Sequence, residues 1–106
     1  MYFYDLKDIP QEGVNYSSAA GHLVAGKYLR VTLLNFEANG GAEEHAHDYE
    51  QIMVVVKGKL RVRVGDQESE IGPGQAFLAP SNVVHEVTAI EDTEVISCKD
   101  VLDAKA

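Results

Sequence analysis

Short runs of strand-forming residues, separated at regular intervals by turn residues, are the feature that most constrains the fold of this chain. Residues 51–57 contain five consecutive apolar side chains and predict a buried strand, whereas residues 60–64 alternate apolar and charged side chains, as a half-buried strand does. Lys57 and Gly58 form a turn signal between them. Since no window shows sustained helical periodicity, we expect an all-β barrel or sandwich.

Turn residues divide the rest of the chain in the same way. Further strands are expected at residues 29–36, 68–71, 77–78, 83–90 and 94–99. The segment 16–24 is less regular and is expected to form one or two strands. We therefore expect one domain. Residues 1–27 should form N-terminal strands with a possible dimer contact, residues 28–99 a barrel, and residues 100–106 a tail that forms a helical turn or frays.

Charge and composition argue against several classes of partner. The 106 residues carry a formal net charge of −8, which disfavours nucleic acid and anionic membrane surfaces. The single cysteine, Cys98, rules out an internal disulfide. The N-terminus lacks the basic patch and apolar stretch of a signal peptide, and no apolar run approaches the length of a membrane span. A cytoplasmic location is therefore the expectation.

Three of the four histidines stand in a pattern that suits a metal ion. His45 and His47 are two residues apart, and on an extended segment such residues face the same side, which Gln51 shares by parity. His85 follows 34 residues after Gln51 and is expected to approach from another strand. Neutral imidazole suits zinc, copper, iron and nickel. The fourth histidine, His22, is expected to be a surface residue or a hydrogen-bonded core residue.

These residues resemble the two motifs of the cupin superfamily, specifically its small single-domain conserved-barrel members. In the first motif, the ligand and glycine positions of the family are matched by His45, His47, Gln51 and Gly58, with Asn39 in place of a glycine. In the second, the matching residues are Gly74, Pro80 and His85, whereas Asn82 replaces a glycine and Ala89 an asparagine. Asparagine tolerates the left-handed turn conformation, so these departures are compatible with the fold. The resemblance covers roughly residues 28–99.

The branch that this chain resembles most has a first motif that reads His-x-His-x-x-Glu-Gln, which His45, His47, Glu50 and Gln51 repeat. The resemblance implies a double-stranded β-helix, or jelly-roll barrel, with a metal ion inside one end. It implies one divalent transition metal per subunit, zinc, nickel, manganese or iron, and His45, His47, Gln51 and His85 as its ligands. Glu50, of opposite parity, is expected to face outward.

Strand parity predicts what surrounds this site. Met53 and Val55 should share the lumen with Gln51, and Val87 and Ala89 should share it with His85, which keeps the pocket dry. Four neutral ligands would leave the full charge of a divalent ion unneutralised. Such a site favours anionic or oxygen-rich small molecules, sugar acids among them.

The branch includes proteins that linearise unsaturated uronates, as well as isomerases, lyases and oxygenases. The uronate-linearising members carry an Asp-x-Phe pair on the last strand, where this chain has Ser97 and Lys99. The lost carboxylate removes the obvious general base and puts that activity in doubt. The other candidate catalytic residues are Tyr28, Arg30 and Lys99, of which Lys99 is expected to be an ordinary exposed lysine rather than an anion ligand.

Parity does not decide which face of residues 28–36 lines the barrel. Either Tyr28 and Arg30 do, or the apolar set Leu29, Val31 and Leu33 does.

Three functions are compatible with these residues. The leading hypothesis is a metal-dependent enzyme that polarises a carbonyl or hydroxyl of a small anionic or sugar-like substrate, with metal-bound hydroxide as the base, and promotes isomerisation or ring opening. The alternatives are an iron-dependent dioxygenase, which a ligand set without carboxylate fits less well, and a non-catalytic small-ligand-binding module. The outward-facing Ile52, Val54 and Val56 are apolar and predict a homodimer.

Overall fold

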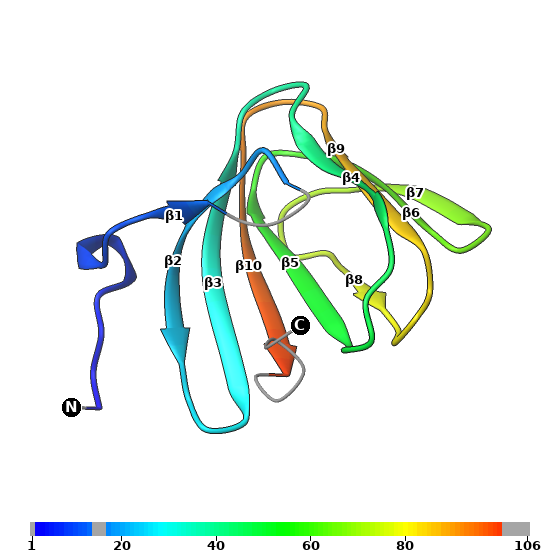
Figure 1. The fold of residues 1–106 in the computed structure, drawn as a ribbon. Coiled ribbons are helices and arrows are strands. Elements are labelled where there is room, and N and C mark those ends of the chain that lie inside the picture. The colour runs from blue at the N-terminus through cyan, green and yellow to red at the C-terminus, as the bar shows by residue number, and fades with distance from the viewer. Residues whose placement is uncertain (1, 14–16, 101–106) are drawn as a thin grey trace.

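The computed structural model describes residues 2–13 and 17–100, and it confirms the all-β prediction (Figure 1). Two antiparallel sheets face each other as the walls of a jelly-roll barrel. The larger sheet has the strand order β1 (Glu12–Gly13), β2 (Ala20–Ala25), β3 (Leu29–Phe36), β10 (Thr93–Asp100), β5 (Gln51–Lys57) and β8 (Ala76–Ala79). The smaller has the order β4 (Gly41–His45), β9 (His85–Ala89), β6 (Leu60–Val64) and β7 (Gln67–Ile71).

The predicted strands agree closely with the observed ones. The bounds of β3, β5 and β6 are those that the sequence predicts, and the strand expected at residues 83–90 is shorter, because it begins at His85. The physical reason is a turn: the Val83 N–H donates to the Pro80 carbonyl at 3.2 Å, which keeps residues 80–83 out of the ladder. A short 3₁₀ helix, η1 (Leu6–Asp8), precedes β1.

Some expectations fall outside the described part of the chain. The segment expected to begin at residue 16 forms β2 from Ala20 onward, while residues 14–16 lie outside the described residues. The tail expected at residues 100–106 is described only at Asp100, the last residue of β10. In the described residues, no helix has the length and apolar character needed to cross a membrane.

Parity along the strands is confirmed. Gln51, Met53 and Val55 are buried, whereas Ile52 and Val56, on the opposite face of β5, are 42% and 44% exposed. On β9, His85, Val87 and Ala89 are likewise buried. The barrel core is therefore built from alternate residues of each strand, as a half-buried sheet requires.

The strand β10 lies between β3 and β5 and aligns the inner residues of the three strands in rows. From the core toward the end where β3 and β5 begin, the rows are Leu34–Val95–Val55, Thr32–Ser97–Met53 and Arg30–Lys99–Gln51. The first row is fully apolar, and the last contains two cations and an amide. The register thus places polar chemistry at one end of an otherwise apolar barrel.

The turn residues that replace family glycines adopt the conformation expected of them. Asn39 and Asn82 have φ angles of 69° and 63°, in the left-handed region. The Asn82 N–H donates to the His47 carbonyl at 2.7 Å, which joins the turn before β9 to the loop after β4. Gly58, with φ of 97°, leaves no room for a side chain, because a Cβ would meet the Asp92 carbonyl oxygen at 2.4 Å.

Candidate metal centre

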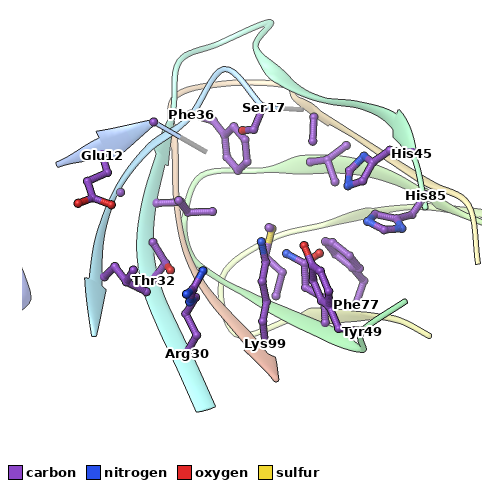
Figure 2. Close-up of a pocket in the computed structure, with 18 residues that line it drawn as sticks. Glu12, Ser17, Arg30, Thr32, Phe36, His45, Tyr49, Phe77, His85 and Lys99 are labelled. Carbon is purple, nitrogen blue, oxygen red and sulfur yellow. The ribbon is translucent and has the colours of Figure 1, made fainter. Parts of the chain in front are cut away.

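A cavity of about 180 Å³ lies between the two sheets (Figure 2). Its apolar wall includes Met53, Val87 and Leu34, and Phe77 from the edge strand β8 also lines it. Glu12 of β1 is the only acidic side chain among its described lining residues. This apolar surround was expected from parity, and it lowers the local dielectric, which strengthens electrostatic interactions inside the cavity.

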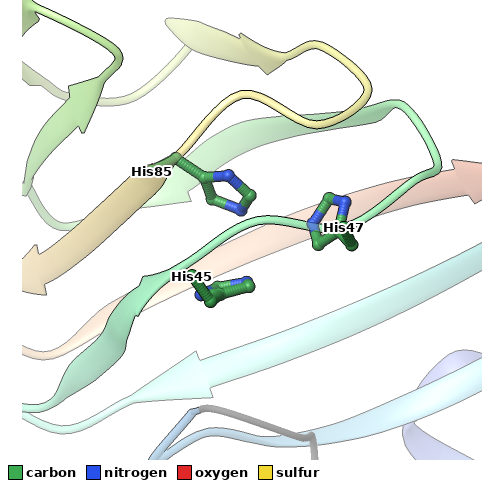
Figure 3. Close-up of side chains that lie close together, drawn as sticks. All are labelled: His45, His47 and His85. Atoms are coloured by element: carbon green, nitrogen blue, oxygen red, sulfur yellow. The ribbon is translucent and has the colours of Figure 1, made fainter.

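Three histidines converge beside this space, and two of them, His45 and His85, line it (Figure 3). His45 ends β4 and pairs directly with His85, which begins β9. His47 lies two residues beyond β4, and the ligand nitrogens of all three lie within 4.8 Å of one another. The ring centroids are 4.3 to 5.4 Å apart. These are the residues that the sequence predicts to gather.

The extended segment expected to carry both His45 and His47 is not a single strand. β4 ends at His45, and His47 belongs to the loop before β5. Contacts outside a ladder hold His47: its carbonyl accepts from the Asn82 N–H, and its ring stacks on Tyr49 with centroids 3.9 Å apart. The loop therefore keeps the ring of His47 close to the ring of His45, although His47 is not part of a strand.

Backbone carbonyls fix the protonation of each ring. The Nδ1 atoms of His45, His47 and His85 contact the carbonyl oxygens of Glu43 at 2.5 Å, Tyr49 at 2.8 Å and Val83 at 3.1 Å. Because a carbonyl oxygen only accepts, Nδ1 must carry the proton in all three rings. In the neutral imidazole the lone pair then resides on Nε2, which is the state that coordinates a metal ion.

The Nε2 atom of His85 is buried and has no hydrogen-bond partner among the described residues. The whole residue is 1% exposed, so water does not readily serve this acceptor. Burial lowers the pKa of His85, and it also lowers the pKa of His47, in both cases more strongly than the neighbouring charges do. Both rings therefore favour the neutral form, and a cation would supply the missing partner of His85.

Gln51 adds a fourth polar atom to the cluster. Its side-chain Nε2 donates to the Ser97 hydroxyl at 2.9 Å, which turns its Oε1 toward the Nε2 of His47, 3.2 Å away. With Nδ1 of His47 protonated, Nε2 and Oε1 are both acceptors that face each other. Two facing acceptors favour a cation between or beside them, so the donor set fits a metal ion.

Arg30 and Lys99 also line the cavity, which settles the open face of β3. Arg30 lies on the inner face, whereas Leu29 is 65% exposed. The expectation that Lys99 is an ordinary exposed lysine is wrong, because the side chain is partly buried in the cavity wall. Burial lowers the pKa of Lys99, and the charge of Arg30 lowers it further.

The remaining candidates lie elsewhere. Tyr28 is 56% exposed and is not among the residues that line the cavity, so the structure does not bring it to the site. His22 bonds through its ring to the Ile9 carbonyl and to Gln11, away from the cluster, as expected for a hydrogen-bonded histidine. Cys98 pairs with Ile52 on the outer face of β10, consistent with its opposite parity.

Sequence reasoning missed Tyr49, which supports His47 by stacking and through its carbonyl. The sequence signal that could have indicated this role is the position of Tyr49 between two predicted ligands, His47 and Gln51. The role of Ser97 as the partner of Gln51 was also missed, because cross-strand pairs depend on register.

Comparisons with known proteins agree with this architecture. Two auxin-binding proteins of Nicotiana tabacum, T92 and T85, are 27% identical over 114 residues and 29% identical over 99 residues. The matches cover 92% and 78% of this chain but 61% and 53% of those proteins, so the chain spans less than two thirds of their length.

Solved structures are similar over nearly the whole chain. KdgF from Halomonas sp. superposes with a TM-score of 0.84 at 25% identity, covering 94% of this chain and 93% of that one. The polyketide cyclase RemF from Streptomyces resistomycificus has a TM-score of 0.82 at 18% identity, covering 94% and 79%, which shows a shared fold. The Cupin_2 family model, described as a cupin domain, matches residues 32–98, which include the three converging histidines and Gln51. This match extends over more than half of the sequence, and the chain therefore belongs to the Cupin_2 family of the cupin superfamily.

Proposed function

We propose that this cupin is a metal-dependent enzyme that acts on a small anionic or sugar-like substrate, a sugar acid for example, by proton transfer of the isomerase or ring-opening type. The observation that supports it best is the buried Nε2 of His85, which has no partner in the described residues and sits beside two further histidines in a small cavity. Burial lowers the pKa of His47 and His85, and perturbed groups of this kind beside a cavity are typical of a functional site.

His45, His47, His85 and Gln51 would hold one divalent transition metal ion, with zinc, nickel, manganese and iron as the candidates. Bound there, the ion supplies Lewis acidity toward a substrate oxygen. The chain's own contribution is orientation: backbone carbonyls hold the three rings by Nδ1, and Ser97 holds the amide of Gln51. Because all four side chains are neutral, they leave the charge of the ion available to an anionic substrate.

The substrate would meet Arg30 and Lys99, which line the cavity, but not Tyr28, which does not. The apolar residues of the wall exclude water around the reacting group.

A second candidate is a non-catalytic module that binds a small ligand through the same residues. The names of the two tobacco relatives, both auxin-binding proteins, favour it. So does Ser97, which stands where the uronate-linearising branch carries a carboxylate. An iron-dependent dioxygenase remains the third outcome of the test below.

Two further expectations remain proposals. The exposed apolar residues on the outer face of β5 support a homodimer through that face. A cytoplasmic location is the other, and fractionation of cells that produce the protein would test it.

The deciding experiment is elemental analysis of the purified protein and of His85→Ala, with His22→Ala as a matched control. We expect His85→Ala to lose the metal and His22→Ala to keep it, since His22 lies outside the cluster. Sugar acids and keto-sugars are then screened with the manganese, nickel and zinc forms. Equal metal content in His85→Ala, or turnover that survives chelation, would overturn the metal-dependent mechanism. Oxygen consumption by an iron form would support the dioxygenase, and tight binding without product the binding module.

A further inference from the structure

Two cations face each other on the inner wall of the barrel. Arg30 and Lys99 are direct partners in the β3–β10 ladder, and both line the cavity (Figure 2). Like charges directly opposite each other on neighbouring strands destabilise a sheet, and partial burial increases the cost. A pair of this kind costs the protein stability unless something outside the chain neutralises it.

Among the described residues, no ion pair joins Arg30 or Lys99 to a carboxylate. The ion pairs there join Arg61 to Glu70 and Arg63 to Glu44 and Glu86, all remote from Arg30 and Lys99. The Nε atom of Arg30 is buried and has no hydrogen-bond partner in the described part of the chain. Arginine is the side chain best suited to hold a planar carboxylate, and an unused buried N–H of its guanidinium is a donor in need of an acceptor.

The position of the pair is also unusual for this protein. The whole chain carries a net charge of −8, yet the described cavity wall holds two cations and a single carboxylate, that of Glu12. A positive cavity in an acidic protein concentrates small anions from solution. Arg30 and Lys99 come from the six-stranded sheet, whereas His45 and His85 come from the four-stranded sheet, so the two groups occupy opposite walls.

We propose that Arg30 and Lys99 form a carboxylate-binding subsite that faces the histidine cluster across the cavity. The ligand is then a small hydroxy acid or keto acid, with its carboxylate on the cationic pair and its hydroxyl or carbonyl oxygen toward the histidines. The cavity of about 180 Å³ limits it to a small molecule, since pockets for drug-sized ligands measure roughly 300–1,000 Å³. This inference extends the proposed function, because it names the substrate class of the same site.

The test uses the metal-free protein, so that its outcome does not depend on metal binding. The probe is 3-hydroxypropionate, and its uncharged counterpart 3-hydroxypropanamide is the control ligand, each titrated by calorimetry and by NMR at low salt. We expect the acid to bind at least about tenfold more tightly than the amide, as charge-assisted hydrogen bonds are stronger than neutral ones. Amide shifts should concentrate on β3 and β10. Equal binding of acid and amide would overturn the subsite.

Variants then assign the effect to the pair. Lys99→Met and Arg30→Met should each weaken binding of the acid by about tenfold or more, whereas Lys99→Arg should keep most of it. Lys57→Met makes the same change at an exposed lysine of β5 outside the cavity wall and should bind like the original protein. If Lys57→Met loses as much affinity as Lys99→Met, the effect is one of net charge and the subsite is refuted.

Thermal stability provides an independent test, because the same substitution should raise Tm and lower the affinity for the acid. Because Lys99→Met removes a like-charge pair and a partly buried cation, we expect its Tm to rise while its affinity for the acid falls. A loss of binding together with a higher Tm is not explained by unfolding. A lower Tm than that of Lys57→Met would show that the pair does not destabilise the empty protein, and would contradict the inference.

Failure of the subsite and failure of the proposed function are distinguishable. Zinc affinity that survives removal of the histidines would overturn the metal site and leave the preference of the metal-free protein for acid over amide intact. Conversely, an unchanged acid preference in Lys99→Met with normal zinc binding would overturn the subsite alone.

Discussion

Gln51 and Ser97 are joined across the β5–β10 pair by a hydrogen bond of 2.9 Å from the amide Nε2 to the hydroxyl oxygen. Both side chains are buried, and the bond decides which atom of the amide faces the cavity. With Nε2 engaged, Oε1 points toward His47. Position 97, where the uronate-linearising branch carries a carboxylate, is thus occupied here by a residue that orients a neighbouring amide.

Ser97→Ala should therefore weaken metal binding. The variant removes the partner of the Gln51 Nε2 and frees the amide to rotate, so we expect zinc affinity to fall by about tenfold, the lower end of the effect of residues that orient metal ligands. Competition with a chromophoric chelator measures it. Ser69→Ala, at an exposed serine of β7, is the control. Equal affinities of the two variants would show that Ser97 does not position Gln51.

Gln51→Glu should change metal and anion binding in opposite directions. A carboxylate at position 51 adds a negative charge beside the histidines, so zinc should bind more tightly, by about tenfold or more, and 3-hydroxypropionate more weakly. Calorimetric titration of the metal-free protein with zinc, and of the zinc form with 3-hydroxypropionate, measures the two affinities. Gln67→Glu, on an exposed residue of β7, adds the same charge away from the cavity and should change neither. Tighter binding of both ligands in Gln51→Glu would contradict the electrostatic argument.

The metal-free protein should lose stability on mild acidification. Burial lowers the pKa of His47 and His85 below the ordinary value of 6.5. Below about pH 6.5 the unfolded chain then binds more protons at these positions than the folded one, so the free energy of unfolding falls as pH falls, and above that pH these groups have no effect.

Urea denaturation of the chelated protein across this range measures the slope. The double variant His47→Gln/His85→Gln lacks both titrating groups, so its free energy of unfolding should vary less with pH between about 5 and 7. An identical slope in the variant and in the original protein would assign the acid sensitivity to other residues.

The strands could be predicted from the sequence alone because they depend on local pattern. Alternation along β5 assigns Gln51 and Met53 to one face and Ile52 to the other, and the structure confirms each assignment. The clustering of His45, His47 and His85 followed from the resemblance, since the two motifs hold them at family positions in the chain.

The cationic pair escaped the sequence analysis for a physical reason. Leu33 and Leu34, on opposite faces of β3, are both buried, so polarity does not reveal which face is inside. The register with β10, a strand distant in the sequence, brings Arg30 opposite Lys99. The position of Lys99 near a strand end favoured an exposed lysine, but the cavity wall partly buries its side chain there. Such positions depend on strand pairing rather than on local pattern.

The outer face of the large sheet gives the last prediction. Ile52 and Leu78 are neighbours on β5 and β8, and they are 42% and 48% exposed. An apolar face on a sheet edge favours pairing with a second copy. We expect sedimentation equilibrium at micromolar concentration to give about twice the 11.6 kDa mass of the chain. Ile52→Glu should shift the protein to monomer, because the symmetric contact would bury two carboxylates, whereas Ile90→Glu, outside this face, should remain dimeric. A mass near that of one chain for the original protein would refute the dimer, and a dimeric Ile52→Glu would place the contact elsewhere.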